Sequence, residues 1–538
     1  MKGRRTKPQA KGYSEAGASV TRRALRGFIP NSGSPAEDID RNNDTLRQRS
    51  RMLYMSSPVA TAAIDTSRTK IVGTGLTLKS ALDRELLGLS PDAAKSWQKR
   101  AESEWRLWCK RENCDALGLN SFLGLQQLAL KSWLTSGDVF ALVKRAEPTP
   151  LNPYSLRLHL IEADRVCTPP NYRGGIMSGV TTGTVPEGKP GAGNMIYDGV
   201  EVDADGRVAA YYVCSGFPTE YTGKDLTWER VLARGEKTGL PNVLHIMNAE
   251  RPDQYRGVPQ LAPVIEPLLQ LRRYTESELM AALVQSFFTA WIETETSSMD
   301  IPFNEVGPGD VAPSGAVDLE GGTGESASED ENEYELGPGT VFHLKEGEKV
   351  VFGNPNIPTA GFEIFFNTMC RMVGAALETP ADVILKKFDA SYSASRGALL
   401  EAWETVKMRR TWFVDDFCQP IYEIWLAEAV ARGRIRAAGY FDDPLLRSAW
   451  SEARWIGPVQ GQLDPLKEAK AALLLVQNGI KTHEQVTREM GGGDWEENVE
   501  QLARENELLK AAGGQPGAGE PSEPEPEDGD GNGENDEL

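Results

Sequence analysis

The sequence has few of the residues that build metal sites, disulfide frameworks and histidine-based catalytic centres. Only four histidines and six cysteines occur among its 538 residues. The cysteines are scattered and no two form a CxxC pair, which favours reduced thiols over disulfides or a zinc site. So few histidines leave little material for a catalytic triad. We therefore expect no bound metal, no cofactor and no enzymatic activity.

Long hydrophobic runs are also absent. The longest, residues 279–292, is interrupted by Gln285, Ser286 and Thr289 and is shorter than the roughly 20 residues that a membrane span needs. The basic N-terminus lacks the apolar stretch of a secretory signal. The sequence thus predicts no membrane segment and a protein that stays in the cytoplasm where it is made.

Acidic residues outnumber basic ones, and they are unevenly placed. The formal net charge is −20, and residues 318–335 hold eight acids and no base, while residues 511–538 hold nine acids and no base. Duplex DNA carries one negative charge per roughly 1.7 Å, so this balance argues against tight, nonspecific DNA binding. Any role with DNA must tolerate repulsion.

Apolar periodicity and capping residues predict an α+β protein of several packed units. One helix should bury an aromatic face, with Trp97, Trp105 and Trp108 in the core rather than free to stack on bases. After residue 464, three short helices should begin at Asp464, Thr482 and Asp494. The predicted helices cover residues 44–55, 58–72, 91–111, 261–291, 362–377 and 395–431. The predicted strands cover residues 139–144, 156–161, 195–202, 208–213 and 243–247, with a hairpin over 340–352.

Three fragments imitate functional motifs. Gly183 to Lys189 has the spacing of a phosphate-binding loop, but Pro190 stands where a Ser or Thr should hold Mg²⁺. The acidic residues of 201–206 match half of a calcium loop, but Tyr212 occupies the position of the bidentate glutamate, so a hairpin turn is favoured. Each fragment lacks a residue that its chemistry requires.

The third fragment supports the one enzymatic alternative. Ser67-Arg-Thr-Lys70 and Lys237-Thr-Gly239 follow the order of motifs in serine acyl-enzymes such as β-lactamases. No Ser-Asp-Asn lies between them. A serine acyl-enzyme that uses Ser67 and Lys70 is therefore a remote alternative.

Several segments together resemble the lambda-type portal proteins of tailed bacteriophages, over about residues 41–509. The order of these segments carries the resemblance, because no single one is decisive. They are Leu46 to Arg51, Ser57 to Ala60, Val72 to Gly75, Ser136-Gly137-Asp138, Arg251 to Pro259, Ser391 to Arg396, Trp455 to Pro458 and Asp464 to Glu468.

The resemblance implies a dodecameric ring at one capsid vertex, which serves DNA packaging, genome retention and ejection. The implied partners are double-stranded DNA, the large terminase subunit, head-completion or tail connector proteins, and the major capsid and scaffold proteins. The implied location is the virion, with assembly in the host cytoplasm. Another ring-forming connector protein of the virion is the alternative.

The resemblance also divides the chain into regions. These are a flexible basic arm (1–40), a β-containing wing (41–258), a stem helix (259–291), a clip with the acidic insert (292–358), a second stem helix (359–378), a channel loop (379–394), a long wing helix (395–439), a helical crown (440–510) and a disordered acidic tail (511–538).

Two groups of residues are singled out for function. Lys386, Lys387 and Arg396, in or beside the channel loop, are candidates for transient contact with DNA, although pairing with loop carboxylates is the plainer interpretation. The second group marks the family motifs and consists of Arg251, Asp253, Tyr255, Arg256, Gly257, Tyr392 and Ser393.

Overall fold

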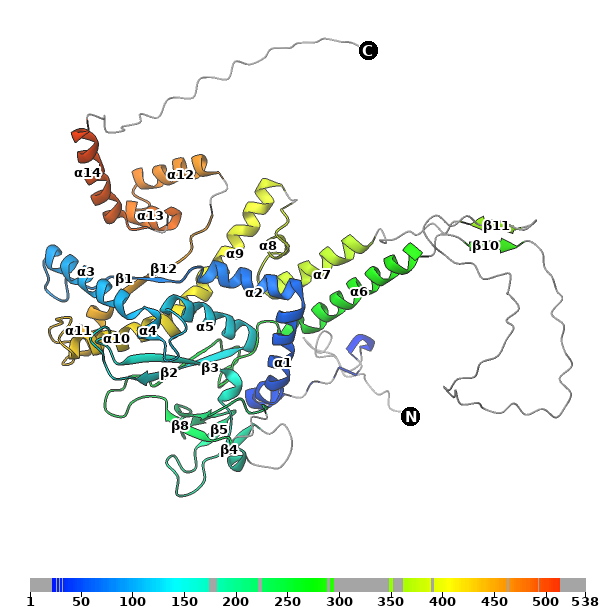
Figure 1. The fold of residues 1–538 in the computed structure, drawn as a ribbon, viewed down its shortest axis with the longest axis horizontal. Coiled ribbons are helices and arrows are strands. Elements are labelled where there is room, and N and C mark those ends of the chain that lie inside the picture. The colour runs from blue at the N-terminus through cyan, green and yellow to red at the C-terminus, as the bar shows by residue number, and fades with distance from the viewer. Residues whose placement is uncertain are drawn as a thin grey trace, which may run out of the picture. The chain divides into compact units, whose positions relative to one another are not determined.

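The computed structural model is a mixed helix-and-sheet structure (Figure 1). It separates into two units, one made of residues 1–269 and 369–538 and the other of residues 270–368. The described residues are 22–25, 27–28, 30, 32–173, 181–220, 225–287, 291–294, 348–351, 361–388, 391–461, 464–491 and 493–512.

The first two long helices form where capping residues predict them. They are α1 (Arg41–Ser56) and α2 (Pro58–Ile71). Ser57 between them is extended, and Pro58 opens α2 at the position where a helix does not need a backbone N–H. After α2, Gly73 has a φ of +59°, a conformation that favours glycine.

An aromatic cluster forms the core around α3 (Pro91–Trp108) and α5 (Phe122–Ser136). The ring of Trp105 lies 4.9 Å from that of Trp108 and 5.1 Å from those of Phe122 and Trp425. Trp97 is only half-buried and lies 4.9 Å from Trp450. The aromatic face is therefore core, as predicted, but α5 was not predicted although Ser121 caps it.

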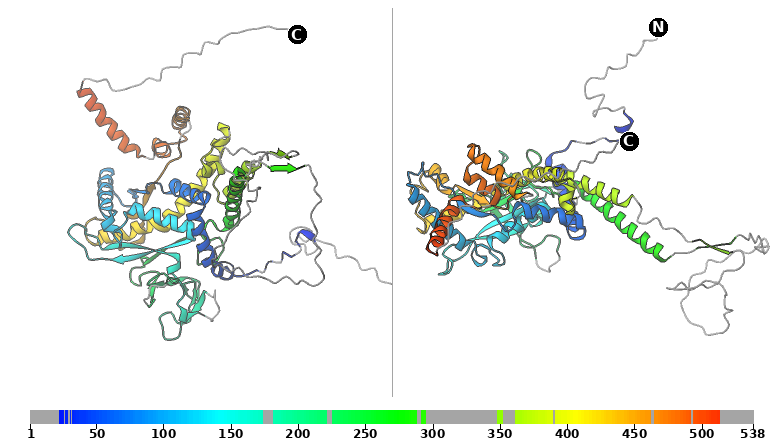
Figure 2. Two further views of the ribbon diagram at one scale, coloured as in Figure 1. Left: turned by 45° about the vertical axis from the view of Figure 1, so that its right-hand side comes forward. Right: turned by 90° about the horizontal axis from the view of Figure 1, so that it is seen from above.

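Two antiparallel sheets make up most of the β structure. In the first, β2 lies between β3 and β9; the second has the order β4-β5-β6-β7-β8. Figure 2 shows the second sheet, together with the helices, from two further sides. The strands are β2 (Asp138–Arg145), β3 (Leu156–Glu162), β4 (Thr182–Thr184), β5 (Met195–Tyr197), β6 (Val200–Val202), β7 (Val208–Cys214), β8 (Trp228–Leu232) and β9 (Val243–Met247).

The prediction of one strand over residues 195–202 is wrong. The segment forms β5 and β6, which pair with each other across a turn at Asp198 and Gly199. Both turn residues have positive φ, +44° and +86°, as a tight hairpin of this kind requires. The adjacent Asp198 and Gly199 are the sequence signal for this turn. The turn places Asp198 in the interior of the protein, where its side chain is buried.

A third, two-stranded sheet joins distant parts of the chain. Its strands β1 (Thr77–Ser80) and β12 (Ala453–Ile456) pair antiparallel, Thr77 opposite Ile456. Neither strand was predicted, because four residues are too few for a clear period. The pairing places Gly73 close enough to the ring of Pro458 that a Cβ at residue 73 would lie 2.4 Å from the proline Cγ.

The predicted helix over residues 261–291 is shorter than expected. The helix α6 (Ile265–Phe287) ends before Trp291, which begins β10 (Trp291–Thr294). Strand β11 (Glu348–Val351) pairs with β10, and residues 340–347 of the expected hairpin lie outside the described part. Tyr274 of α6 contacts Phe365 of α7 (Phe362–Ala376), with ring centroids 4.7 Å apart.

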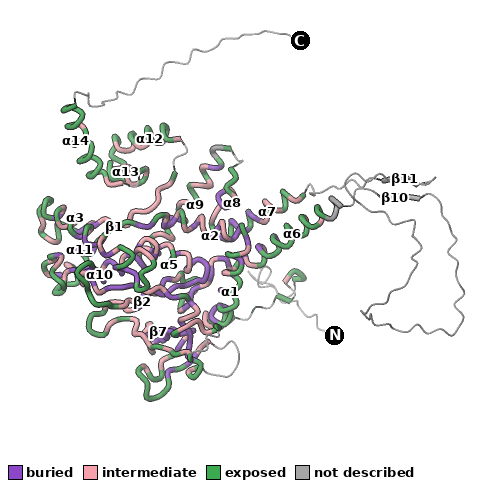
Figure 3. Tube along the Cα trace, viewed as in Figure 1, coloured by how far each residue is buried: buried purple, intermediate pink, exposed green. Residues whose placement is uncertain are grey.

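The remaining helices mostly follow their predicted caps. Residues 392–431 are helical throughout, as predicted for 395–431, but a π-helical turn (Val414–Cys418) separates α9 from α10. Figure 3 shows that α12, α13 and α14 are largely exposed. The bounds are α4 (Arg111–Cys114), α8 (Ala381–Leu385), α9 (Tyr392–Phe413), α10 (Gln419–Ala431), α11 (Pro444–Ser451), α12 (Pro465–Gln477), α13 (His483–Gly491) and α14 (Trp495–Ala511).

Candidate functional site

Arg256 lies at the centre of a buried charge cluster. Its side chain is fully buried, and its guanidinium group donates to Asp138 at 2.7 Å and to Asp198 at 2.6 Å. It also donates to the backbone carbonyls of Ala163 and Val166, each at 2.8 Å. A buried guanidinium needs such a full set of acceptors, because an unpaired buried charge is strongly unfavourable.

The same cluster connects three of the family segments. Arg47 of α1 donates to the carbonyl of Ser136 at 3.3 Å and to Asp198 at 3.4 Å. Asp138 accepts the backbone N–H of Gly257 at 3.1 Å. Residues separated by up to 210 positions in the sequence thus share one network of hydrogen bonds.

The backbones of Gly137 and Gly257 touch at this cluster. A Cβ at residue 257 would lie 2.0 Å from the carbonyl oxygen of Gly137, and one at residue 137 would lie 2.6 Å from the carbonyl oxygen of Gly257. Asn43 donates to that carbonyl of Gly257 at 3.0 Å. Glycine is therefore required at both positions by close packing.

Burial and neighbouring charges shift the pKa values of the ionisable groups in this cluster in opposite directions. Burial alone would raise the pKa of Asp138, but the guanidinium groups of Arg256 and Arg47 hold it well below its usual range. Burial, aided by Asp198, raises the pKa of Asp40 to about 7. Burial also lowers the pKa of His245, whose Nε2 lies 3.5 Å from Asp138. The cluster combines two guanidinium groups with three carboxyl groups, so one carboxyl tends to keep its proton.

The other residues of the Arg251 to Pro259 segment also make structural contacts. Arg251 donates to Asp38 at 2.6 Å, and Tyr255 donates its hydroxyl hydrogen to the carbonyl of Gly206 at 3.1 Å. Asp253 has a φ of +59°, which fits a turn. The motif residues of this segment therefore hold the fold together, and none of them lies in the cavity described below.

The channel-loop candidates do not form one cluster. Arg396, on α9, forms an ion pair with Glu468 at 3.4 Å, which joins the segments Ser391 to Arg396 and Asp464 to Glu468. Lys386 is exposed and ends α8 in the left-handed conformation, with φ +56°. Lys387 is exposed as well and takes part in interactions of its own. Tyr392 and Ser393 open α9, and their side chains lie outside the described part.

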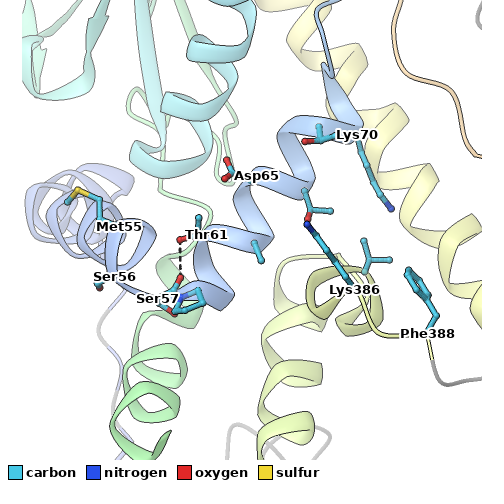
Figure 4. A pocket seen from close by; sticks show the side chains of 13 residues that line it. Met55, Ser56, Ser57, Thr61, Asp65, Lys70, Lys386 and Phe388 are labelled. Carbon is cyan, nitrogen blue, oxygen red and sulfur yellow. Dashed lines mark hydrogen bonds between the residues drawn. The ribbon is translucent and has the colours of Figure 1, made fainter. Parts of the chain in front are cut away.

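A cavity of about 690 Å³ lies between α2 on one side and α8 with the residues that follow it on the other. One wall is the α2 face from Ser57 to Lys70, and the other carries Val383, Lys386 and Phe388. Figure 4 shows the Lys386 side chain extending toward α2 and the Lys70 side chain extending toward Phe388. Two ammonium groups more than 300 residues apart in the sequence therefore line one cavity.

Lys70 was not among the predicted contact residues. It is half-buried, and burial lowers its pKa. Within the described part of the chain, neither Lys70 nor Lys386 has an ion-pair partner, while Asp65 of the same cavity accepts from the hydroxyl of Tyr54 at 3.2 Å and lies 3.6 Å from Arg68. Such a site favours an anionic group. The sequence predicts that Lys70 lies on a helix, but nothing in it indicates that this helix packs near α8.

The imitated motifs do not assemble the sites that they suggest. Ser67 donates its hydroxyl hydrogen to the carbonyl of Ala63 at 2.9 Å, inside its own helix. Asp203 accepts the backbone N–H groups of Asp205 and Arg207, which makes a turn between β6 and β7. No helix starts after Lys189 in the described residues 181–220.

No group of three or more metal-ligating side chains occurs among the described residues. None of their helices is both long and apolar enough to cross a membrane.

Comparisons with known proteins converge on one family. Residues 21–410 match the family described as phage portal protein, lambda family. Portal protein B of Escherichia phage lambda is 23% identical over 504 residues, which cover 92% of this chain and 89% of that protein. The portal protein of Escherichia phage N15 is 23% identical over 502 residues, which cover 92% and 90%.

Among solved structures, one from the neck of a native GTA particle, computed with C12 symmetry, aligns with a TM-score of 0.39 and 13% identity. That alignment covers 84% of this chain and 94% of the other. The family match extends over most of the chain and includes the buried cluster around Arg256. The chain therefore belongs to the lambda family of phage portal proteins.

Proposed function

We propose that copies of this chain form a dodecameric ring at one capsid vertex and that DNA enters and leaves the capsid through its channel. The family match over residues 21–410 is the observation that carries this proposal. In this role the protein performs no covalent chemistry. It guides DNA that a terminase motor drives, retains the packed genome and passes it to the tail.

The regions of the ring subunit are assigned as follows. The sheets and helices of residues 41–258 would form the wing, α6 and α7 the stem, and α12 to α14 part of the crown. The ring would dock the terminase and later the head-completion or tail connector proteins, and the clip would comprise residues 292–358. Capsid and scaffold proteins would contact the ring from outside, and assembly would take place in the host cytoplasm.

The channel wall must let DNA slide, so its attraction for phosphate has to be weak. Acidic side chains repel the duplex over a Debye length of about 8 Å at physiological salt. A few cations can touch the phosphates transiently without holding them. The cavity beside α2 suits this role, since its two ammonium groups have no carboxylate partner within the described residues.

We assign the DNA contact to Lys386 together with Lys70, rather than to all three candidates. Arg396 already neutralises Glu468, which reduces its attraction for a phosphate. Lys387 stays a weaker candidate because it has other interactions. Lys386 and Lys70 line one cavity from its two walls, so both can act as point charges on a phosphate group that enters it.

Packaging by phage that carry variant chains tests this assignment. The variants are Lys70→Gln, Lys386→Gln and the double variant, with Lys237→Gln as a matched control in an exposed loop. Glutamine keeps most of the side-chain length and removes the charge. We expect normal incorporation of the chain into capsids, but fewer DNA-filled heads or poorer genome retention with the double variant.

The salt dependence separates a phosphate contact from a structural effect. Loss of phosphate contacts should flatten the dependence of packaging or retention on ionic strength. If the double variant packages and retains DNA as the Lys237→Gln control does at every salt concentration, the assigned contact is wrong. Capsids that lack the chain altogether would instead point to a defect in assembly.

A further inference from the structure

The three C-terminal helices have no core of their own. None of the described residues of α12, α13 and α14 is buried. Six leucines of α12 and α14 each expose between 45% and 66% of their surface. Apolar side chains gathered on short helices in this way indicate a surface that another protein covers. The six are Leu466, Leu473, Leu474, Leu502, Leu508 and Leu509.

These leucines form two matching faces of opposite charge. On α12, Leu466 is followed four residues later by Lys470 and then by Leu473 and Leu474. On α14, Leu502 is followed three residues later by Glu505 and then by Leu508 and Leu509. Spacings of three and four place each set on one side of its helix. We call them the α12 face and the α14 face.

Both charged side chains, Lys470 and Glu505, are exposed to solvent. Neither forms an ion pair with any described residue. Glu505 accepts a hydrogen bond from the side chain of Gln501, one turn earlier in α14, at 2.8 Å. An apolar face that carries one cation and a similar face that carries one anion are complementary.

The α14 face does not pack on the rest of its own chain. α14 is held to the body near its N-terminal end, where Lys79 pairs with Glu497 and Lys95 pairs with Glu500, whereas Leu508 and Leu509 lie two turns or more further along the helix. Leu502 is about 200° round the helix from Glu500. The ion pairs therefore fix α14 while its leucines stay exposed, as Figure 3 shows for most of the helix.

We propose that the α12 face of one copy packs against the α14 face of the next copy, head to tail. Contacts between two different faces of identical chains generate a closed ring when the rotation between copies closes. The inference thus rests on the proposed ring and names one contact that builds it. DNA does not fit these faces, since it offers them no apolar surface and its phosphates repel Glu505.

Cross-linking tests which faces meet. The full chain with Lys470→Cys and Glu505→Cys is treated with a short bismaleimide, and each single variant serves as the background control. Of the native cysteines, only Cys109 is not buried. We expect a ladder of covalently linked copies from the double variant and none from either single variant.

Charge reversal gives an independent test. Lys470→Glu makes both faces acidic, and Glu505→Lys makes both faces basic. Each variant alone should need a higher concentration to assemble, by roughly fivefold at low salt. An equimolar mixture should assemble like the unmodified chain, because each contact then joins opposite charges. Glu507→Lys, which lies about 140° round α14 from Leu502 and about 100° from Leu508, is the control and should leave the assembly concentration unchanged.

The outcomes separate this inference from the ring itself. Unmodified rings together with no ladder, or with reversals that behave like the control, would overturn the head-to-tail contact and leave the proposed function standing. A link within a single chain would overturn it as well. If the unmodified chain forms no ring under conditions that assemble capsids, the proposed function fails, and this inference fails with it.

Discussion

Replacing Arg256 by methionine should destabilise the fold severely. Methionine fills a similar apolar volume but donates nothing, so of its two guanidinium partners Asp138 keeps only the more distant Arg47, at 3.6 Å, and Asp198 keeps Arg47 at 3.4 Å. The backbone carbonyls of Ala163, Val166 and Asp198 each lose a hydrogen bond as well. Removing one partner of a buried ion pair costs roughly 3–5 kcal/mol. That is a large part of a typical unfolding free energy of about 5–15 kcal/mol.

Urea unfolding followed by tryptophan fluorescence measures the effect. The midpoint for Arg256→Met should fall by roughly 1–2 M relative to the unmodified chain. Arg251→Met is the matched control from the same segment. Its ion pair with Asp38 is exposed, 40% and 47% for the two side chains, so its loss should cost less than about 1 kcal/mol.

The pH dependence gives a second signature. Without Arg256, the pKa of Asp138 should rise, and protonation would then relieve the buried charge at low pH. The cost of Arg256→Met should therefore be larger at pH 8 than at pH 5. Equal losses for Arg256→Met and Arg251→Met, at both pH values, would refute the view that the cluster is a buried electrostatic centre of the fold.

Three further outcomes are expected. Burial raises the pKa of Asp40 in the folded state to about 7, so the protonated side chain stabilises the fold fully below about pH 4, and this stabilisation is lost as the pH rises through 7. Asp40→Asn should therefore be more stable than the unmodified chain at pH 8 and should lose that advantage at pH 4. Thermal melts at both pH values check this. Gly257→Ala should lower the melting temperature because its Cβ would collide with the Gly137 carbonyl, whereas Gly461→Ala, where the space is open, should not. A β-lactam probe should leave Ser67 unlabelled, and labelling that disappears in Ser67→Ala would contradict this.

Elements with strong local signals were predictable from the sequence. The helix caps at Ser90, Asp464 and Asp494 accept backbone N–H groups as the capping patterns require. Thr482 and Gln485 make the predicted reciprocal pair of bonds at the start of α13. These features depend on residues within one turn of each other, so the sequence alone determines them.

Elements that depend on distant partners were not predictable in the same way. Strands β1 and β12 have four residues each and exist because they pair with each other across more than 370 positions. The end of α6 before Trp291 likewise depends on the pairing of β10 with β11. A short strand has too few residues for a periodic signal, and its partner cannot be read from its own composition.

The residues of the buried cluster and the proposed DNA-contact residues differ in the same way. Three residues of the buried cluster lie in segments that carry the family resemblance, namely Arg256, Gly257 and Asp138. They lie in the interior, where replacing one of them destabilises the fold and where neighbouring atoms leave no space for a different side chain. A transient contact with the DNA backbone has no such requirement, because a phosphate responds to positive charge within reach and not to a particular residue at a particular position. Lys70 and Lys386 carry no motif, and only the folding of α8 against α2 brings them to one cavity. In a channel of the proposed kind, which must let DNA slide, the residues that would touch DNA are therefore better identified by cations that line one cavity without an ion-pair partner among the described residues than by sequence patterns. The Lys70 and Lys386 double variant tests that principle along with the proposed site.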